Sequence, residues 1–167
     1  SLQELGITDL RCSIFERLML RCKANGWHHA WGMLSTHFRM HDEIAALVNH
    51  FYAGQLASGT SQQQLPFLNK LTTGSDEAGW EGILSQGRKL FIPSPREATS
   101  KMNRTEAQWV VSLLQFLKDK YGHRFTPSLV GVVTPWRTQI SLIRELIGDD
   151  PVLQQVNIDT VERFQGS

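Results

Sequence analysis

Three short segments of the chain carry side chains suited to phosphate groups and nucleobases. The first is His37-Phe38-Arg39-Met40-His41. A Phe ring can stack on a base, and the planar guanidinium of Arg39 stays charged and can donate to two phosphate oxygens at once. A structural alternative stands beside this interpretation, with Phe38 buried and Arg39 paired at the surface with Asp42 or Glu43.

The second segment, Thr134-Pro135-Trp136-Arg137, opens a helical pattern directly after a strand-like run. We expect Thr134 to be the N-cap and Pro135 the first helical residue, which leaves N–H groups that attract a phosphate. Arg137 would add positive charge, and Trp136 could stack on a base. The alternative is an ordinary capped helix whose Trp packs in the core.

The third segment runs from Thr160 to Gly166 and reads Thr-Val-Glu-Arg-Phe-Gln-Gly. It places a hydroxyl at the end of a strand-like run. The pair Gln165-Gly166 follows, and a glycine there lets the backbone approach a ligand closely. A plain turn is the alternative.

Other catalytic sites find little support in the residue pattern. His37 and His41 lie four apart, but they lack the Glu of the His-Glu-x-x-His motif and a matching carboxylate or thiolate, so we predict no metal site. No Ser, His and Asp residues stand in the order of a hydrolase triad. Cys12 and Cys22 are the only cysteines, and we interpret them as reduced thiols of a cytoplasmic or, in a eukaryote, nuclear protein.

The composition is that of one folded domain. Of 167 residues, 41% are hydrophobic and 20% charged, enough for a buried core. The net charge of +1 excludes a polybasic strip but allows a local nucleic-acid groove. No apolar run suits a membrane helix, and the first residues do not resemble a secretion signal. Neither Gly-x-x-x-x-Gly-Lys-Ser/Thr nor Gly-x-Gly-x-x-Gly occurs, so a nucleotide would need its phosphate cradle from elsewhere.

Hydrophobic periodicity predicts the elements that position these segments. In the first half we expect a helix over residues 1–26 that stops at Gly26, and a strand over 31–36. A second helix opens at Asp42 and ends at Gly54. Its apolar stripe, which we expect to be buried, consists of Ile44, Leu47, Val48 and Phe51.

In the second half, residues 57–88 are rich in Ser, Gly, Gln and Thr and predict a long surface excursion. A helix capped by Asn103, with Glu106 three residues on, runs to Tyr121. The helix after Thr134 has one apolar face. Strands are expected over 89–93, 129–134 and 156–160.

Helices and strands therefore alternate along the chain, which predicts an α/β fold with a mainly parallel sheet and helices on its faces. In such sheets ligands bind beyond the carboxyl ends of the strands. All three chemical segments follow predicted strands, so we expect them at that edge.

The order of these motifs resembles the second motor domain of superfamily 1 helicases, nearest to the branch of nonsense-mediated-decay and Okazaki-fragment-processing helicases. The blocks that carry the resemblance are Ser13-Ile14-Phe15-Glu16-Arg17-Leu18, His37-Phe38-Arg39-Met40-His41, Phe51-Tyr52-x-Gly54, Asn103-Arg104-Thr105-Glu106-Ala107, Gly131-Val132-Val133-Thr134-Pro135-Trp136 and Asp159-Thr160-Val161-Glu162-Arg163-Phe164-Gln165-Gly166.

The resemblance implies a three-layer, RecA-like domain with a P-loop NTPase-like fold, spanning residues 1–167. In such enzymes it is the second of two domains that clamp ATP and Mg²⁺ between them and move along single-stranded DNA or RNA. By the same resemblance Phe38 stacks on adenine, Arg39 reaches the γ-phosphate and Gln165-Gly166 lies beside the nucleotide phosphates.

The resemblance implies that Thr134, Pro135 and Thr160 contact the nucleic-acid backbone. Trp136 and Arg137 belong to the same motif as Thr134 and Pro135. Asn103 is expected to support this nucleic-acid-binding face. The expected partners are the nucleic acid and the first RecA-like domain of the same polypeptide, with no membrane.

The pattern departs from the family at several positions. Phe38 replaces the common Tyr and loses a hydroxyl, His37 stands where a Gln is frequent, and Asp42 replaces a Pro. The first motor domain and the last motif are absent, so we expect a piece of a longer protein that alone binds no cofactor and does not hydrolyse ATP. The alternative function is a non-motor nucleic-acid-binding or scaffolding module. DNA and RNA are not distinguished.

Overall fold

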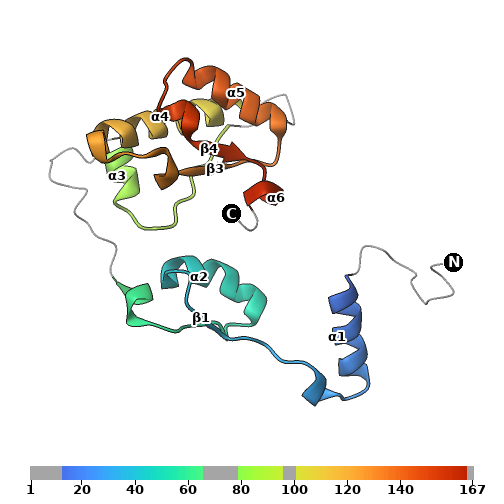
Figure 1. The fold of residues 1–167 in the computed structure, drawn as a ribbon. Coiled ribbons are helices and arrows are strands. Elements are labelled where there is room, and N and C mark those ends of the chain that lie inside the picture. Colours follow the sequence, from blue (N-terminus) through green and yellow to red (C-terminus); the bar gives the residue numbers. More distant parts are fainter. Residues whose placement is uncertain (1–12, 66–78, 96–100, 165–167) are drawn as a thin grey trace, which may run out of the picture. The chain divides into compact units, whose positions relative to one another are not determined.

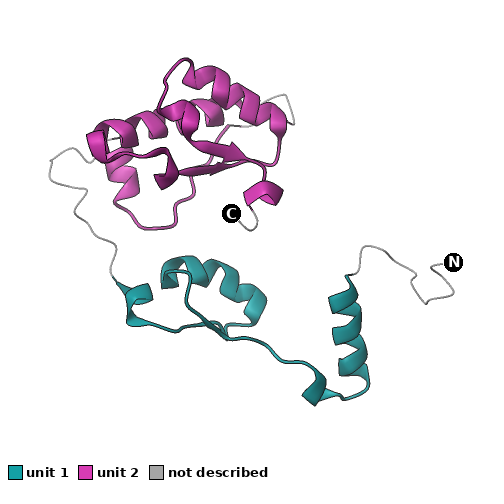
Figure 2. Ribbon diagram, viewed as in Figure 1, with its two compact units in different colours: residues 1–67 teal, residues 68–167 magenta. Residues whose placement is uncertain are grey.

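The computed structural model describes residues 13–65, 79–95 and 101–164. The chain divides into two compact units, residues 1–67 (unit 1) and residues 68–167 (unit 2), coloured separately in Figure 2. Among the described helices none is both long and apolar enough to cross a bilayer.

Unit 1 contains a helix and then a small strand–helix–strand motif (Figure 1). Strands β1 and β2 pair in parallel, with Thr36 opposite Ala57 and His37 opposite Ser58. The elements in order are α1 (Ile14–Ala24), a 3₁₀ turn (His28–Ala30), β1 (Thr36–His37), α2 (Asp42–Val48), a 3₁₀ turn (Asn49–Tyr52), β2 (Ala57–Ser58) and a 3₁₀ turn (Ser61–Gln64).

Local capping explains where the helices of unit 1 begin and end. The Ser13 hydroxyl accepts the N–H of Glu16 at 3.1 Å, which satisfies one of the unpaired donors at the start of α1. Gly26 has φ of +66° two residues after the helix, a conformation that favours glycine. The ring of His41 caps α2 by accepting the N–H of Glu43. Both predicted helices are present among the described residues, but the second is α-helical only to Val48 and continues as the 3₁₀ turn Asn49–Tyr52 before Gly54.

One other expectation for unit 1 is wrong, and a second is not met within this unit. The strand predicted over 31–36 is limited to Thr36–His37, because residues 31–35 have no strand to pair with among the described residues. The apolar stripe of the second helix is not buried within unit 1: Phe51 is 84% exposed, and Ala45 is the buried residue of α2. A sheet of two short strands offers too little surface to cover that stripe.

Unit 2 contains a second strand–helix–strand motif, which follows a long helix in the chain. Its strands β3 and β4 pair in parallel, Gly131 with Asn157 and Val133 with Asp159. The elements in order are α3 (Trp80–Leu84), α4 (Arg104–Tyr121), 3₁₀ turns (Gly122–Arg124 and Pro127–Leu129), β3 (Gly131–Val133), α5 (Arg137–Ile147), a 3₁₀ turn (Leu153–Gln155), β4 (Asn157–Asp159) and α6 (Val161–Phe164).

A hydrophobic core joins α4, α5 and β4 in unit 2. Leu114 of α4 and Ile143 of α5 are both 1% exposed, and Ile158 brings β4 into the same cluster. These positions follow the apolar faces that the sequence predicted for both helices. The remaining buried members are Ala107, Phe125, Leu142, Ile147, Leu153 and Val156.

Polar contacts fasten the loop between α5 and β4. The Arg144 guanidinium donates to the carbonyl oxygens of Gln154 at 2.7 Å and Val156 at 2.8 Å. The Asp150 carboxylate pairs with Lys118 of α4 and accepts a backbone N–H from Leu153 at 3.0 Å. The hydrogen bond from Lys118 is the main reason that the pKa of Asp150 lies below its usual value.

The strands predicted over 129–134 and 156–160 form as the shorter β3 and β4, and several other predictions differ from the structure. The strand expected over 89–93 does not form: Phe91 is 90% exposed and its neighbours join no sheet among the described residues. Helix α5 begins at Arg137 with Trp136 as N-cap, so neither Thr134 nor Pro135 has its predicted place in the helix. The segment 57–88, predicted as a surface excursion, contains β2, a 3₁₀ turn and α3 in its described part.

Every strand pair among the described residues is parallel, as predicted for an α/β fold. The strands form two separate pairs, one in each unit. The three-layer arrangement of a single sheet stays a prediction.

Leu114→Ala should destabilise unit 2 by about 2–5 kcal/mol, because it removes a fully buried side chain and leaves a cavity between α4 and α5. The matched control is Leu129→Ala, since Leu129 is 60% exposed and should cost under about 1 kcal/mol. Urea unfolding of the 167-residue chain measures both values. Equal losses in the two variants would contradict the placement of the core.

Candidate functional site

The chemical residues of unit 1 lie directly after β1. Phe38 is 70% exposed, and its ring rests on Gly59, where an added Cβ would lie 2.2 Å from a ring carbon. Gly59 follows β2, so the Phe38 ring in the loop after β1 packs on the backbone of the loop after β2. Phe38 is therefore not buried in unit 1, contrary to the structural alternative.

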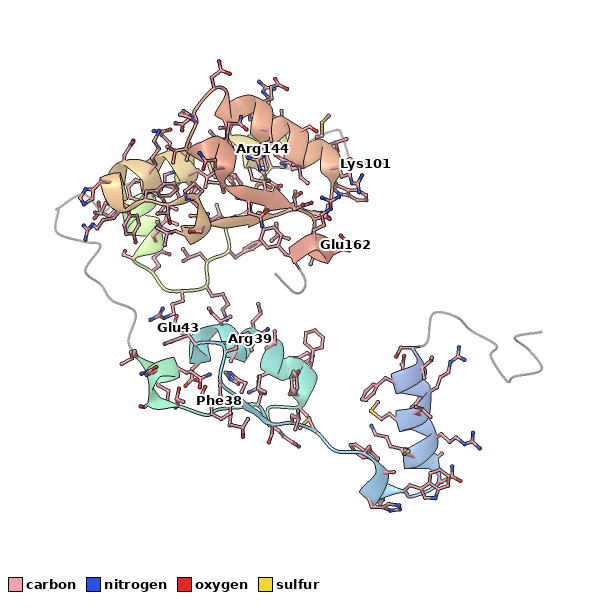
Figure 3. The ribbon with its side chains drawn as sticks, viewed as in Figure 1. Phe38, Arg39, Glu43, Lys101, Arg144 and Glu162 are labelled. Atoms are coloured by element: carbon pink, nitrogen blue, oxygen red, sulfur yellow. The ribbon has the colours of Figure 1, made fainter. Side chains whose placement is uncertain are left out.

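Arg39 projects from the same loop, as Figure 3 shows with Phe38 and Glu43. Within the part of the chain that the structure describes, its guanidinium makes no hydrogen bond or ion pair. The neighbouring Asp42 carboxylate, which could have bound it, accepts instead from the Ser58 hydroxyl. An exposed arginine without an internal partner is available to an anionic ligand.

A buried amide holds this loop in place. Gln63 is 7% exposed, and its side chain contacts the residues on both sides of Phe38 and Arg39. Its Nε2 lies 2.9 Å from Nδ1 of His37 and donates to the carbonyl oxygen of Met40 at 2.8 Å. Sequence reasoning missed Gln63, although the spacing Thr60-x-x-Gln63 is that of a capping box, which the structure contains.

In unit 2, parallel pairing brings Thr134 and Thr160 side by side. Each follows the last residue of its strand, and the N–H of Thr134 extends the ladder by donating to the carbonyl oxygen of Asp159 at 3.1 Å. Two of the three predicted segments therefore meet at one edge of the β3–β4 pair, as expected for the carboxyl ends of parallel strands.

Thr134 is buried, whereas Thr160 is partly exposed. Thr134 is 7% exposed, and its hydroxyl lies 3.5 Å from the N–H of Trp136, so it shapes the turn before α5. Pro135, Trp136 and Arg137 are exposed. The Trp136 ring has the Lys101 ammonium 5.6 Å from its centre, which adds a cation to this edge.

The start of α6 lies at the same edge. The pKa of the Glu162 carboxyl is lowered, first by its own backbone N–H, then by the Thr160 hydroxyl, with a smaller attraction from the Arg137 guanidinium. Arg163 lies 3.5 Å from a carboxylate oxygen of Asp159. An open groove of about 330 Å³ is lined by Arg137, Ile140, Ser141, Ile158, Asp159 and Arg163.

Asn103 is a structural cap in this arrangement. Its side-chain oxygen accepts the N–H of Glu106 at 2.8 Å, and its Nδ2 donates to the carbonyl oxygen of Pro95. Its backbone N–H and carbonyl exchange two hydrogen bonds with the buried amide of Gln139, at 2.8 and 2.9 Å. Asn103 therefore fixes the start of α4 against α5, and any direct contact of Asn103 with nucleic acid stays a prediction.

Gln165 and Gly166 lie outside the described residues, so their predicted place beside nucleotide phosphates also stays a prediction. In the described segments no three His, Cys, Asp or Glu side chains gather where they could hold a metal ion. Cys22 lies on α1 as an unpaired thiol.

Comparison with known proteins places the chain in a family. The family model for the AAA domain matches residues 10–167. The chain belongs to this family. The match and the relatives below confirm the predicted superfamily 1 helicase resemblance, and the family implies a P-loop NTPase-like α/β fold.

Three relatives among curated proteins are all named helicases. A probable helicase of Dictyostelium discoideum is 28% identical over 162 residues, which cover 92% of this chain and 14% of that protein. The RNA helicase Mov10l1 of Homo sapiens is 25% identical, covering 94% of this chain and 14% of its own length. The DNA replication ATP-dependent helicase/nuclease DNA2 of Mus musculus is 28% identical, covering 80% and 14%. This helicase domain thus spans about 14% of the relatives it matches.

Thr160→Val should raise the pKa of Glu162 toward its ordinary value, because it removes the hydroxyl that stabilises the carboxylate. The lowered pKa means that this carboxylate stabilises the fold above its unfolded-state pKa, and that the contribution is lost as the pH falls through the folded-state value. An NMR titration of the Glu162 carboxyl carbon measures the shift. Thr126→Val is the control, since the Thr126 hydroxyl bonds to Ser128 instead. An unchanged Glu162 pKa in Thr160→Val would contradict the hydrogen bond.

Proposed function

We propose that residues 1–167 are the second RecA-like motor domain of an ATP-dependent superfamily 1 helicase. The observation that carries the proposal is in unit 1, where an exposed aromatic ring and an arginine without a partner among the described residues share one loop. ATP and Mg²⁺ would act in the full-length enzyme, which would be cytoplasmic or, in a eukaryote, nuclear.

Phosphoryl transfer to water requires positive charge at the γ-phosphate and little covalent chemistry from the protein. Arg39 suits this task because the guanidinium stays charged and can donate to two phosphate oxygens. Phe38 offers a ring face for the adenine, supported from behind by Gly59. The phosphate cradle and the Mg²⁺ ligands would come from the first motor domain, so closure of the two domains would deliver Arg39 to the nucleotide.

In unit 2, the edge formed by Thr160 and the residues before α5 would hold the backbone of single-stranded DNA or RNA. Arg137 and Lys101 supply charge for phosphates, the hydroxyl of Thr160 supplies a donor, and exposed Trp136 supplies a stacking surface. Thr134 and Asn103 would position the segments that bind the nucleic acid, and Pro135 would lie along the nucleic-acid strand. Contacts of this kind carry no base preference, which suits translocation.

Arg39→Ala in the full-length protein should lower nucleic-acid-stimulated kcat by about 10³-fold, as expected when an arginine that stabilises the transition state is removed. The affinity for ATP should change by less than about tenfold, because the effect falls on the transition state. The measurements are steady-state turnover and equilibrium nucleotide binding.

The control for this experiment is Arg21→Ala on α1, which should leave both values unchanged. If Arg39→Ala weakens binding and spares kcat, the arginine does not act in catalysis. If the full-length protein hydrolyses no ATP at all, the non-motor alternative replaces the proposal.

Arg137→Ala should weaken single-stranded nucleic-acid binding equally for all base sequences. The slope of log K against log salt should become shallower by about 0.7, the value for one phosphate contact on a single strand. Fluorescence anisotropy over a salt series, with homopolymeric DNA and RNA, measures it. Arg124→Ala is the control, since Arg124 is exposed in a 3₁₀ turn outside this edge. A loss confined to one base sequence would contradict backbone binding.

A further inference from the structure

The Gln63 side chain makes five hydrogen bonds within unit 1, and the sequence predicted no part for it in the site. Its Oε1 accepts the N–H of Gly59 at 3.0 Å, the N–H of Thr60 at 2.9 Å and the Thr60 hydroxyl at 3.2 Å. Three donors on one atom fix that atom as the oxygen, so the other end of the amide is the donor Nε2.

The Nε2 end reaches the opposite loop. It donates to Nδ1 of His37 at 2.9 Å and to the carbonyl oxygen of Met40 at 2.8 Å. Because Nδ1 of His37 accepts this hydrogen bond, the ring proton of His37 must lie on the other ring nitrogen, Nε2 of His37. That nitrogen lies 3.4 Å from the Ser58 hydroxyl. That hydroxyl in turn donates to Asp42 at the start of α2. One amide thus links the residues after β1 to the residues after β2.

Phe38 and Arg39 stand between His37 and Met40, the two residues of this loop that Gln63 bonds. His37 before them is held by Gln63 and by its own carbonyl, which accepts the N–H of Gly59 at 2.8 Å. Met40 after them is held at its carbonyl. The residues on both sides of Phe38-Arg39 are therefore held by hydrogen bonds. The two side chains can project outward from a backbone that is fixed at both ends.

We propose that Gln63 is a positioning residue for Arg39 and Phe38, which fixes the loop that presents them to the nucleotide. This inference rests on the proposed function, since it assigns Gln63 a part in the same site. The side chain is buried and acts through its hydrogen bonds to the His37 ring and the Met40 carbonyl oxygen. Effective catalysis depends on such placement, and a displacement of about 1 Å can cost about 10²-fold in rate.

Substitutions at position 63 can separate the two ends of the amide. Gln63→Met keeps the length and burial of the side chain but removes all five hydrogen bonds. Gln63→Glu keeps an oxygen for the donors of Gly59 and Thr60, but it places a second oxygen against the carbonyl of Met40. It can keep the link to His37 if that ring moves its proton to Nδ1. The neighbouring Gln62 is exposed, so Gln62→Met is a matched control.

The experiment measures kcat and the equilibrium dissociation constant for ATP in the full-length protein, with saturating single-stranded nucleic acid and below the unfolding temperature of every variant. We expect Gln63→Met to lower kcat by about 10–100-fold with less than about a threefold change in ATP affinity. Gln63→Glu should fall between Gln63→Met and the parent protein. Gln62→Met should match the parent protein.

Arg39→Ala in the same assay separates the two proposals. If Arg39→Ala slows turnover but Gln63→Met and Gln63→Glu both keep the parent kcat, the positioning role is wrong and the proposed function stands. If Arg39→Ala keeps the parent kcat, the proposed function fails. Should Gln63→Met not fold, Gln63→Glu decides alone: a lower kcat at unchanged ATP affinity supports the role, and parent kcat or a loss of affinity alone overturns it.

Discussion

Parallel pairing of very short strands is the constraint on which both candidate sites depend. In a parallel pair the two strands run in the same direction, so the residues after each strand emerge at one edge. In unit 1 this places Phe38 and Arg39 beside Gly59. In unit 2 it places Thr160 beside the turn that leads into α5. Each pair is connected by a helix, and the helix makes parallel pairing possible.

Strands of two or three residues supply few ladder hydrogen bonds, and in each unit a buried amide joins further segments. Gln63 links the two loops of unit 1, and Gln139 links the start of α4 to the start of α5 in unit 2. A buried amide is stable only when its donors and acceptor are satisfied, and both amides are. Buried polar groups thus contribute to the geometry of these loops, together with apolar contacts such as that of Phe38 with Gly59.

The longer helices could be predicted from the sequence because their signals are local, whereas the short α3 and α6 could not. Asn103 and Glu106 define the start of α4, and Gly26 follows the end of α1, without reference to any distant residue. The same holds for the apolar faces of α4 and α5. The residue types of the Phe38–Arg39 loop and the order of motifs around it likewise mark it as a candidate site.

Strands and polar attachments could not be predicted in this way, because they depend on partners. Residues 89–93 have a strand-like composition but no partner among the described residues, whereas Ala57–Ser58 have no strand-like pattern and pair with β1. Thr134 resembles a helix cap, yet its N–H extends the β3–β4 ladder, and the first acceptor of α5 is the carbonyl oxygen of Trp136. The role of Gln63 could not be predicted, because it depends on two loops that meet only in the folded structure.

The contact between Phe38 and Gly59 has a consequence for the thermodynamics of ligand recognition. An exposed aromatic side chain normally loses rotational freedom when a ligand covers it, and this loss opposes binding by roughly 0.5–1.5 kcal/mol for an immobilised side chain. A ring already seated on a glycine backbone has few orientations left to lose. A planar ligand would therefore meet a surface whose entropy had been reduced during folding, and the absence of a side chain at position 59 makes that surface possible.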